Sequence, residues 1–516
     1  AASDVYKRQQ NIVQSGLDDP KVYQLLQKGY TQNIFQFSSK GMTKFLVSMQ
    51  PDKIEDLIAA NALFRPATLD SGSTDKYVDC KLGDADPVYL WGTYNAMKNT
   101  YGVLCYQEQL AQIAREVGKF SLGEGVKLVK LISKKKVDKI LALRDKFMTG
   151  ANENGCPKED AEAIWHMFEV AGGYLFNKSH ATAYAVTAYA GAYLKANYPT
   201  AFYTIALQWA KDDEIPTLMS EMELCSEAKI VPPDINVSGG TFITDYETNK
   251  IFWSLSRIKM LGAKATEWII NERNVRGEFS SIENFIERIF RYKLKQYKYW
   301  DDPDNPNEVT KCPVNARHVR HLILSGCFDK VENAQSVIER YAILEKAAKC
   351  LGFEISEKDI PEDLRNKHYF WSQQQIAISG IGAIDYKRIY DNSEAKPKIK
   401  GKASWALLKN IQDPDYDGKR VAICANIVDI EEKKFKDKKT GENRVFCKLL
   451  LQQNNDLVEM VIWNDEWMNV RATLCKGGSL SSAKNKMLIC SAQVKYSDYT
   501  GGNNLQLYKS SIIDIL

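Results

Sequence analysis

The chain has 516 residues, of which 44% are hydrophobic and 26% are charged. This composition excludes a disordered chain, a collagen-like repeat and a small disulfide scaffold, and at roughly 150 residues per domain the length predicts three or four domains. The 69 basic and 65 acidic residues leave a formal charge of +4. Because that charge is too small to indicate nucleic-acid or membrane binding, any basic surface must be local.

The sequence contains neither a long apolar run nor a signal-peptide pattern. Its eleven cysteines are scattered without a Cys-x-x-Cys pair, which is typical of reduced thiols. We therefore expect a cytoplasmic protein that does not span a membrane. Residues 1–9 do not resemble the start of any structural element and are interpreted as a non-native scar.

Helical apolar spacing dominates the chain from residue 17 to residue 213. One expected helix, over 180–197, begins just after Ser179 as its N-cap and ends before Pro199. Other helical segments are predicted over 160–171, 255–289 and 315–351, with a strand-like stretch after 230–237, a polar loop at 300–313 and a linker at 393–402.

After Gly418 the pattern changes to short β-type runs separated by Gly, Asn and Lys turns. Strands are predicted over 421–430, 444–451, 457–463, 486–495 and 505–508. Five strands in about 95 residues are typical of a small barrel of the oligonucleotide-binding (OB) type.

The segment Phe176-Asn177-Lys178-Ser179-His180 opens the expected helix over 180–197. The start of a helix has unpaired N–H groups and the positive end of the helix dipole. With the four polar side chains added, the segment could form a phosphate-binding site. The alternative is an ordinary capped helix with a solvated lysine.

Eight cations meet only two acids between residues 127 and 146, and they include Lys130, Lys134, Lys135 and Lys136. A run of charge is most often a solvated helix face. The alternative is a surface that binds nucleic-acid phosphates, with release of counterions.

A tight turn is predicted at 258–265, where Gly262 allows the chain to reverse and Lys259 and Lys264 supply charge. Such a hairpin between helices can direct backbone N–H groups at a DNA phosphate. Residues 379–382 repeat the pattern, although short glycine turns are common in all proteins.

Two other sets of residues are weak candidates for metal sites. Cysteines and histidines spread over 312–327 lack the tight ligand pairs of a structural zinc site. Acidic residues at 212–214 and 413–417 fall in polar connecting segments, whereas two-metal chemistry needs carboxylates fixed on rigid elements. No metal site is predicted.

Aromatic residues lie on or near the expected barrel strands, among them Phe446, Trp463, Tyr496, Tyr499 and Tyr508. Exposed rings of this kind can stack on the bases of a single strand. Alternatively, Phe446 and Trp463 fill the core of the barrel.

The order of these motifs resembles the bacterial replicative DNA polymerase III alpha subunit, of the C family of DNA polymerases. The resemblance rests on Leu17 to Pro20, the Phe35-Gln36-Phe37 stretch, Ala62 to Pro66, Tyr106 to Gln109, Lys134 to Lys136, Phe176 to His180, Pro232 to Asn236, the 258–265 turn, Ser325 to Asp329 and the final barrel.

The resemblance implies a mainly α-helical fingers region and helix-hairpin-helix region, followed by an all-β OB-type barrel. The expected limits are fingers at 10–213, helix-hairpin-helix region at 214–350, helical connector at 351–420 and OB domain at 421–516. It also implies a carboxy-terminal fragment of a DNA-directed DNA polymerase, in which the Mg²⁺ ligands belong to a palm outside this segment, so that the fragment alone is inactive.

Implied partners are primer-template DNA and dNTP, with a sliding clamp as a further candidate although no clear clamp-binding peptide is present. The dNTP phosphates are assigned to Arg65, Lys130, Asn177, Lys178, Ser179 and His180. DNA is assigned to Lys134, Lys135, Lys136, Lys259, Gly262, Lys264, Phe446 and Trp463.

Departures from the family pattern are Ser38, Val129, Ser133 and Met260, the last in place of the first hairpin glycine. They favour a divergent member, with a phage as one candidate source. The alternative function is a non-catalytic DNA-binding protein built from the hairpin and OB modules.

Overall fold

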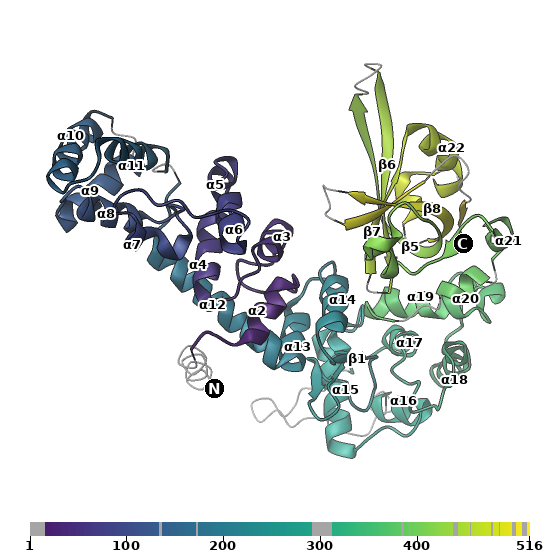
Figure 1. Ribbon diagram of the computed structural model, residues 1–516. Helices are drawn as coiled ribbons and strands as arrows, with labels where there is room; N and C mark the ends of the chain where they lie inside the picture. The colour runs from purple at the N-terminus through teal and green to yellow at the C-terminus, as the bar shows by residue number, and fades with distance from the viewer. Residues whose placement is uncertain are drawn as a thin grey trace. The chain divides into compact units, whose positions relative to one another are not determined.

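The computed structural model describes residues 16–133, 137–171, 174–290, 312–382, 386–391, 393–399, 401–436, 442–454, 456–475, 478–484, 486–497, 502–507 and 513–515. The chain forms two compact units, residues 1–202 and 203–516. Figure 1 shows that the first is helical, whereas the second combines helices with β-sheet.

The first unit has two hydrophobic cores. Its helices are α2 (Pro20–Gln27), α3 (Lys40–Met49), α4 (Ile54–Leu63), α5 (Pro66–Asp70), α6 (Ser73–Leu82), α7 (Tyr94–Met97), α8 (Gln107–Glu116), α9 (Leu122–Ser133), α10 (Val137–Glu153), α11 (Lys158–Ala171) and α12 (Lys178–Asn197). One core joins α2, α3 and α4 to α12, and the other joins α7 to α11.

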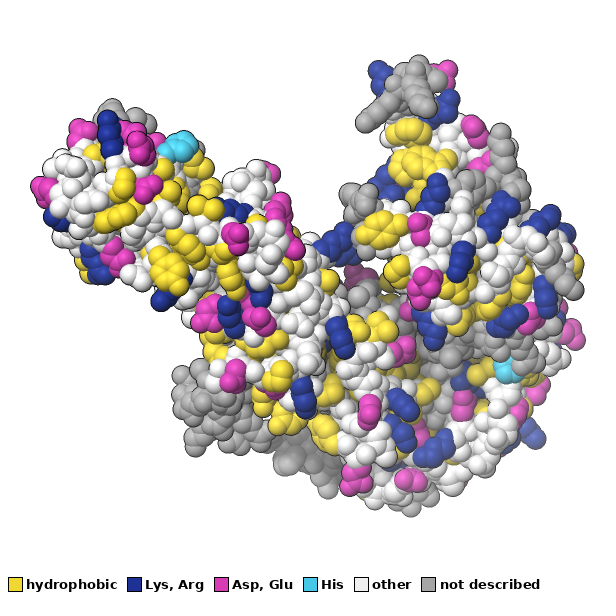
Figure 2. Space-filling model, in the orientation of Figure 1, with side chains coloured by type: hydrophobic (Ala, Val, Ile, Leu, Met, Phe, Trp, Pro, Cys, Tyr) yellow, Lys and Arg dark blue, Asp and Glu magenta, His cyan; other side chains and the backbone are white. Residues whose placement is uncertain are grey.

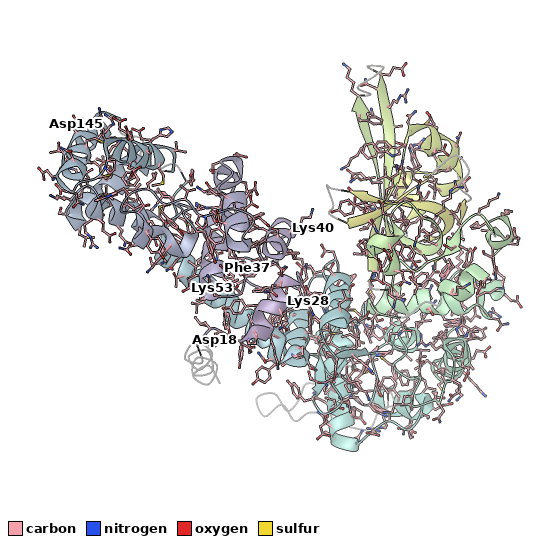
Figure 3. The ribbon with its side chains drawn as sticks, viewed as in Figure 1. Asp18, Lys28, Phe37, Lys40, Lys53 and Asp145 are labelled. Atoms are coloured by element: carbon pink, nitrogen blue, oxygen red, sulfur yellow. The ribbon has the colours of Figure 1, made fainter. Side chains whose placement is uncertain are left out.

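Small residues explain how α12 packs in the first core. Ala181, Ala185, Ala188 and Ala192 recur on one face of α12 and are buried, so that α2 and α4 can approach its backbone closely. In the Phe35 to Phe37 stretch, Phe37 is buried in this core, while Lys40 at the start of α3 projects from the surface (Figure 3).

The helical part of the second unit surrounds a third core. It comprises α13 (Pro199–Trp209), α14 (Ile215–Cys225), α15 (Ala263–Arg276), α16 (Ile282–Phe290), α17 (Ala316–Leu324), α18 (Arg340–Leu351), α19 (His368–Ser379), α20 (Tyr386–Asp391) and α21 (Ala395–Ile399), with a small sheet of β1 (Lys229–Val231), β2 (Ile243–Asp245) and β3 (Lys250–Phe252). Residues of α15 to α19 supply most of the core.

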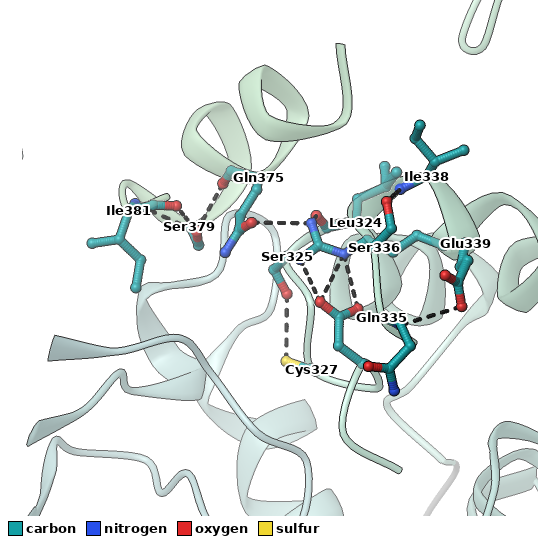
Figure 4. Close-up of polar contacts among 12 residues, drawn as sticks. Leu324, Ser325, Cys327, Gln335, Ser336, Ile338, Glu339, Gln375, Ser379 and Ile381 are labelled. Carbon is teal, nitrogen blue, oxygen red and sulfur yellow. Dashed lines mark hydrogen bonds and ion pairs between the residues drawn. The ribbon is translucent and has the colours of Figure 1, made fainter. Parts of the chain in front are cut away.

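A buried arginine joins three of these helices (Figure 4). Arg340 on α18 donates to Asp329 Oδ1 at 2.8 Å, to the carbonyl of Leu324 at 3.2 Å, and to Gln375 Oε1 of α19 at 3.0 Å. Gly326 adopts φ = 90°, and a Cβ there would lie 2.6 Å from Arg340 Nη2. The glycine of the Ser325 to Asp329 motif is therefore required both by the turn and by the arginine.

The carboxy-terminal strands form a ring. They are β4 (Ser404–Trp405), β5 (Arg420–Lys436), β6 (Asn443–Gln453), β7 (Asp456–Ile462), β8 (Met487–Ser497), β9 (Gly502–Gln506) and β10 (Ile513–Ile515), with α22 (Asn464–Cys475) between β7 and β8. The ring order is β5-β6-β7-β9-β8, closed by the β8–β5 pairing. Of these five ring pairings, β7–β9 is parallel and the other four are antiparallel. The predicted all-β carboxy-terminal region is confirmed as a ring-like sheet, and its assignment to the OB type stays a prediction.

Residues of β5 alternate between two environments. Val421, Ile423 and Ala425 enter the barrel core, whereas Ala422 and Cys424 pack beside α20 and α21. Beyond the ring, β5 and β6 continue as a two-stranded extension over 431–436 and 443–446, hereafter the β5–β6 arm (Figure 1).

Several helix limits differ from the expected ones. The expected helix over 255–289 is a 3₁₀ turn (Leu255–Arg257) followed by α15 and α16, and the one over 315–351 is α17 and α18. The expected linker at 393–402 contains α21. The domain limits inferred from the sequence stay predictions.

Candidate nucleic-acid interface

The backbone holds the starts of α8 and α12 side by side. Phe176 N donates to the Cys105 carbonyl at 2.9 Å, and Gln107 N donates to the Phe176 carbonyl at 2.9 Å. This short parallel bridge places Glu108, in the first turn of α8, next to the first turn of α12.

Side chains accept from two of the first backbone N–H groups of α12. The N-cap is Asn177, not Ser179 as expected: Asn177 Oδ1 accepts from His180 N at 2.9 Å and from Ser179 Oγ at 2.6 Å. Glu108 accepts from Lys178 N at 2.9 Å and from Asn177 Nδ2 at 3.0 Å. A carboxylate thus occupies the position that a phosphate would take.

Aromatic rings hold the nearby cations. Lys178 Nζ lies 5.5 Å from the Tyr106 ring centre. The Arg65 guanidinium lies 4.4 Å from the Phe176 ring centre and donates to the carbonyls of Ala62 and Tyr174. Burial lowers the pKa of Arg65 from its usual range, but the group stays charged.

Side-chain rings continue along α12 from this point. The His180 ring packs between Phe176 and Tyr184, at 5.5 and 4.2 Å between ring centres, and Tyr184 contacts Phe35 at 5.0 Å. His180 and Phe35 are exposed. The structure therefore brings Arg65, Asn177, Lys178, Ser179 and His180 together around one helix start.

The lysine-rich segment is only partly described. Lys134, Lys135 and Lys136 lie outside the described residues, whereas Lys130 is exposed on α9. The neighbouring Val129 lines a cavity of about 370 Å³ between α8 and α9, whose rim includes Glu108 and Asn177. Further along, Lys146 is paired with Glu124, so part of the cationic run is neutralised.

The 258–262 turn has an open helix start. Gly262 is the N-cap of α15, and no side chain caps that helix. Lys259, Gly262 and Lys264 are all exposed, and a Cβ at Gly262 would meet no atom within 4 Å. This turn therefore presents backbone N–H groups and two cations to solvent, as phosphate binding requires.

The expected role of Gly262 in the turn is wrong. Gly262 has φ = −69°, which any residue can adopt, whereas Met260 takes the left-handed value, φ = 71°. The missing side chain at Gly262 leaves space in front of α15 instead of permitting a special dihedral angle.

Rings gather on and beside the β5–β6 arm: Phe435 and Phe446 belong to the arm, whereas Trp463 directly follows β7. Phe435, Phe446 and Trp463 contact one another with ring centres 5.3 to 5.8 Å apart, and Trp463 is 43% exposed. None of the three belongs to the barrel core, so the alternative that Phe446 and Trp463 fill it is wrong. In the pairing register Lys433 lies opposite Phe446, and Arg444 lies opposite Phe435. Hydrophobic side chains with Lys and Arg beside them cover the arm in Figure 2.

Three features of the interface were missed from the sequence: Glu108, Phe435 and the left-handed Met260. Two of them carried a signal: lysines flank Phe435 near the end of a strand, and Met260 stands in place of the first hairpin glycine. Of the expected barrel aromatics, Tyr496 is exposed on β8, and Tyr499 and Tyr508 lie outside the described residues.

Two other tests concern metals and membranes. Within the described ranges, no group of three or more His, Cys, Asp and Glu side chains could hold a metal ion. In the same ranges, the helices are too short or too polar to cross a bilayer.

Comparison with known proteins identifies the class. Residues 2–155 match the bacterial DNA polymerase III alpha subunit finger domain, and residues 227–299 match a helix-hairpin-helix motif. Residues 1–9, interpreted as a scar, lie outside the described residues, although the finger match extends into them. These matches show that the chain is similar to the finger domain of bacterial DNA polymerase III alpha subunits and contains a helix-hairpin-helix motif.

Full-length relatives narrow the assignment. The chain is 35% identical to DNA polymerase III subunit alpha of Aquifex aeolicus over 340 residues, 65% of this chain and 27% of the relative. It is 28% identical to that of Escherichia coli K12 over 522 residues, 97% of this chain and 42% of the relative. The chain is similar to bacterial DNA polymerase III alpha subunits over most of its length, and it spans less than half the length of these two relatives.

The Glu108 carboxylate competes with any anion at the start of α12, which gives a testable prediction. In Glu108→Gln the negative charge is removed, so tripolyphosphate should bind about fivefold more tightly, consistent with roughly 1 kcal/mol for two solvated charges about 4 Å apart in water. Isothermal titration calorimetry measures the change.

The control is Glu116→Gln, which changes the net charge equally but lies at the other end of α8. Equal effects of the two substitutions would show that the Glu108 carboxylate has no specific influence on anions at α12.

Proposed function

We propose that this chain is the DNA-holding part of a DNA-directed DNA polymerase in DNA replication. In this proposal the chain binds duplex DNA at the 258–262 turn and the start of α15. It binds single-stranded DNA on the β5–β6 arm and contributes to dNTP binding at the start of α12. The observation that carries the proposal is the uncapped N-terminus of α15 between two exposed lysines, in a segment that matches a helix-hairpin-helix motif.

Charge geometry supports different tasks for the two helix starts. At α15, the phosphate can approach the backbone N–H groups directly, because Gly262 leaves that space empty. At α12, the Lys178 ammonium and the His180 ring are the groups available to a triphosphate, since Asn177 and Glu108 already cap the helix. Lys130, Lys134, Lys135 and Lys136 are proposed to contact phosphates nearby.

The arm supports a preference for single strands. Its three rings contact one another at an exposed edge, and base stacking tolerates any sequence. Its cations are partly neutralised: Lys433 pairs with Glu431 at 3.1 Å and Arg444 with Glu442 at 3.6 Å. We expect weak binding that does not depend on sequence. All eleven cysteines are free thiols, which supports a cytoplasmic location.

Gly262→Ala tests the hairpin. The methyl group meets no protein atom, but it fills the space in front of α15, so the affinity for a 20-base-pair duplex should fall about tenfold, as expected for one or two charge-assisted hydrogen bonds. Lys264→Ala should instead reduce the slope of log K against log salt by roughly 0.9. Fluorescence anisotropy at several salt concentrations measures both.

The control is Gly191→Ala, which adds the same methyl group on α12, 3.9 Å from Ile34 Cδ1. Because Ala caps a helix less well than Gly, Gly262→Ser should also bind duplex weakly while retaining wild-type stability. Wild-type duplex affinity in both Gly262 variants would overturn the hairpin assignment.

Substitutions at the arm test the single-strand site. Phe435→Ala and Trp463→Ala should each lower the affinity for oligo-dT about tenfold, since stacking contributes about 1–3 kcal/mol per base. Duplex affinity should not change. Tyr496→Ala is the control, because Tyr496 is 58% exposed on β8 and outside the ring cluster. Unchanged oligo-dT affinity in both arm variants contradicts this assignment.

Primer extension tests the catalytic part of the proposal. Two-metal chemistry needs carboxylates held close together, and we propose that residues other than those described supply them. The purified chain should bind a primed template and incorporate no dNTP with Mg²⁺ present. Measurable Mg²⁺-dependent incorporation would show that this chain carries the catalytic site itself.

A further inference from the structure

Two histidines of α17 contact the backbone of the 258–262 hairpin. His321 Nδ1 lies 2.6 Å from the Lys259 carbonyl oxygen. Because a carbonyl can only accept, Nδ1 carries the proton and donates. The Met260 backbone hydrogen-bonds the neighbouring His318 ring. His318 Nδ1 accepts from Asn315 N at 3.3 Å, so its proton is on Nε2 when the ring is neutral.

The contacted segment contains an unfavourable backbone conformation. Met260 has φ = 71°, which is disfavoured for any residue with a Cβ. The Met260 side chain is 59% exposed, so its burial offsets little of the free-energy cost of this backbone conformation. Such conformations persist only where the surrounding structure determines them.

The other hydrogen bonds of the turn are between backbone groups, and the side chains of Ile258 and Leu261 are buried in the core. Lys259 N donates to the Ile378 carbonyl at the end of α19 at 2.8 Å, and Gly262 N donates to the Met260 carbonyl at 3.1 Å. Among the described residues, the imidazole of His321 is the side chain that fixes the Lys259 carbonyl. It does so from α17, whose Leu322 and Ile323 are buried in the core.

We propose that His321, with His318 beside it, is a positioning residue for duplex DNA. Its Nδ1–H holds the Lys259 carbonyl so that Met260 stays in the left-handed conformation, and the N–H groups at the start of α15 then face the phosphate. This role rests on the proposed function of the hairpin, and it explains why histidines occupy these positions without a metal ligand set.

The test is a set of four variants in the full 516-residue chain. His321→Ala should weaken binding of a 20-base-pair duplex about fivefold and leave oligo-dT binding unchanged. His321→Asn, which keeps an N–H donor at the δ position, should bind duplex within twofold of the wild type. In Met260→Gly/His321→Ala the glycine adopts the left-handed conformation freely, so duplex affinity should return. Met260→Gly alone should bind like the wild type.

Wild-type duplex affinity in His321→Ala, or no recovery in the double variant, would overturn the proposal. If circular dichroism shows that His321→Ala does not fold, His321→Gln takes its place. The glutamine side chain carries its N–H donor one bond further from the backbone than Nδ1 of histidine. The His321→Gln variant should therefore bind duplex about fivefold more weakly than the His321→Asn variant. Equal affinities of these two would overturn the proposal as well.

A measurement without DNA separates this inference from the proposed function. The chain has five histidines, so ¹⁵N-histidine NMR gives few signals. We expect His321 as the Nδ1–H tautomer in the wild type. An Nε2–H tautomer would contradict the positioning role whether or not duplex binds; absence of duplex binding with an Nδ1–H signal would contradict only the proposed function.

Discussion

The first backbone N–H groups of an α-helix have no partner within the helix, and the two helix starts of this interface satisfy that requirement differently. At α12, Asn177 and the Glu108 carboxylate accept from the N–H groups. At α15, no side chain does so, and Gly262 leaves the approach open. An anion meets a negative charge at the first helix and free donors at the second. This difference supports phosphate binding through backbone donors at α15 and through side chains at α12.

The position of the hairpin depends on contacts far from it in sequence. Arg340 ties α18 to Gln375 of α19, and the end of α19 accepts from Lys259 N and from the Trp253 indole, the latter at 2.8 Å. On another side, α17 contacts the Lys259 carbonyl through His321. Arg340 also forms an ion pair with Asp329. Removing one partner of such a pair is costly because the buried arginine would lose its counter-charge, so these contacts give the exposed turn a rigid base.

The sequence allowed the ring of strands, the long α12 and the cluster at 176–180 to be predicted, because alternation and helical spacing are local signals. It did not allow the cap of α12 to be predicted, because Glu108 reaches Lys178 only through the bridge between residues 106 and 176. The sequence analysis assigned the turn to the conformational freedom of Gly262, since a glycine is the usual residue in a left-handed turn. In the structure Met260 is the left-handed residue instead. Phe435 was missed because β5 continues past the ring, where no barrel neighbour constrains it.

Hydrogen–deuterium exchange of the full chain, with and without a 20-base-pair duplex, tests most directly whether the open start of α15 binds the duplex backbone. The account predicts that duplex slows exchange in peptides covering residues 258–266 and leaves peptides at the start of α12 unchanged. Slowed exchange at 176–182 with none at 258–266 would contradict it.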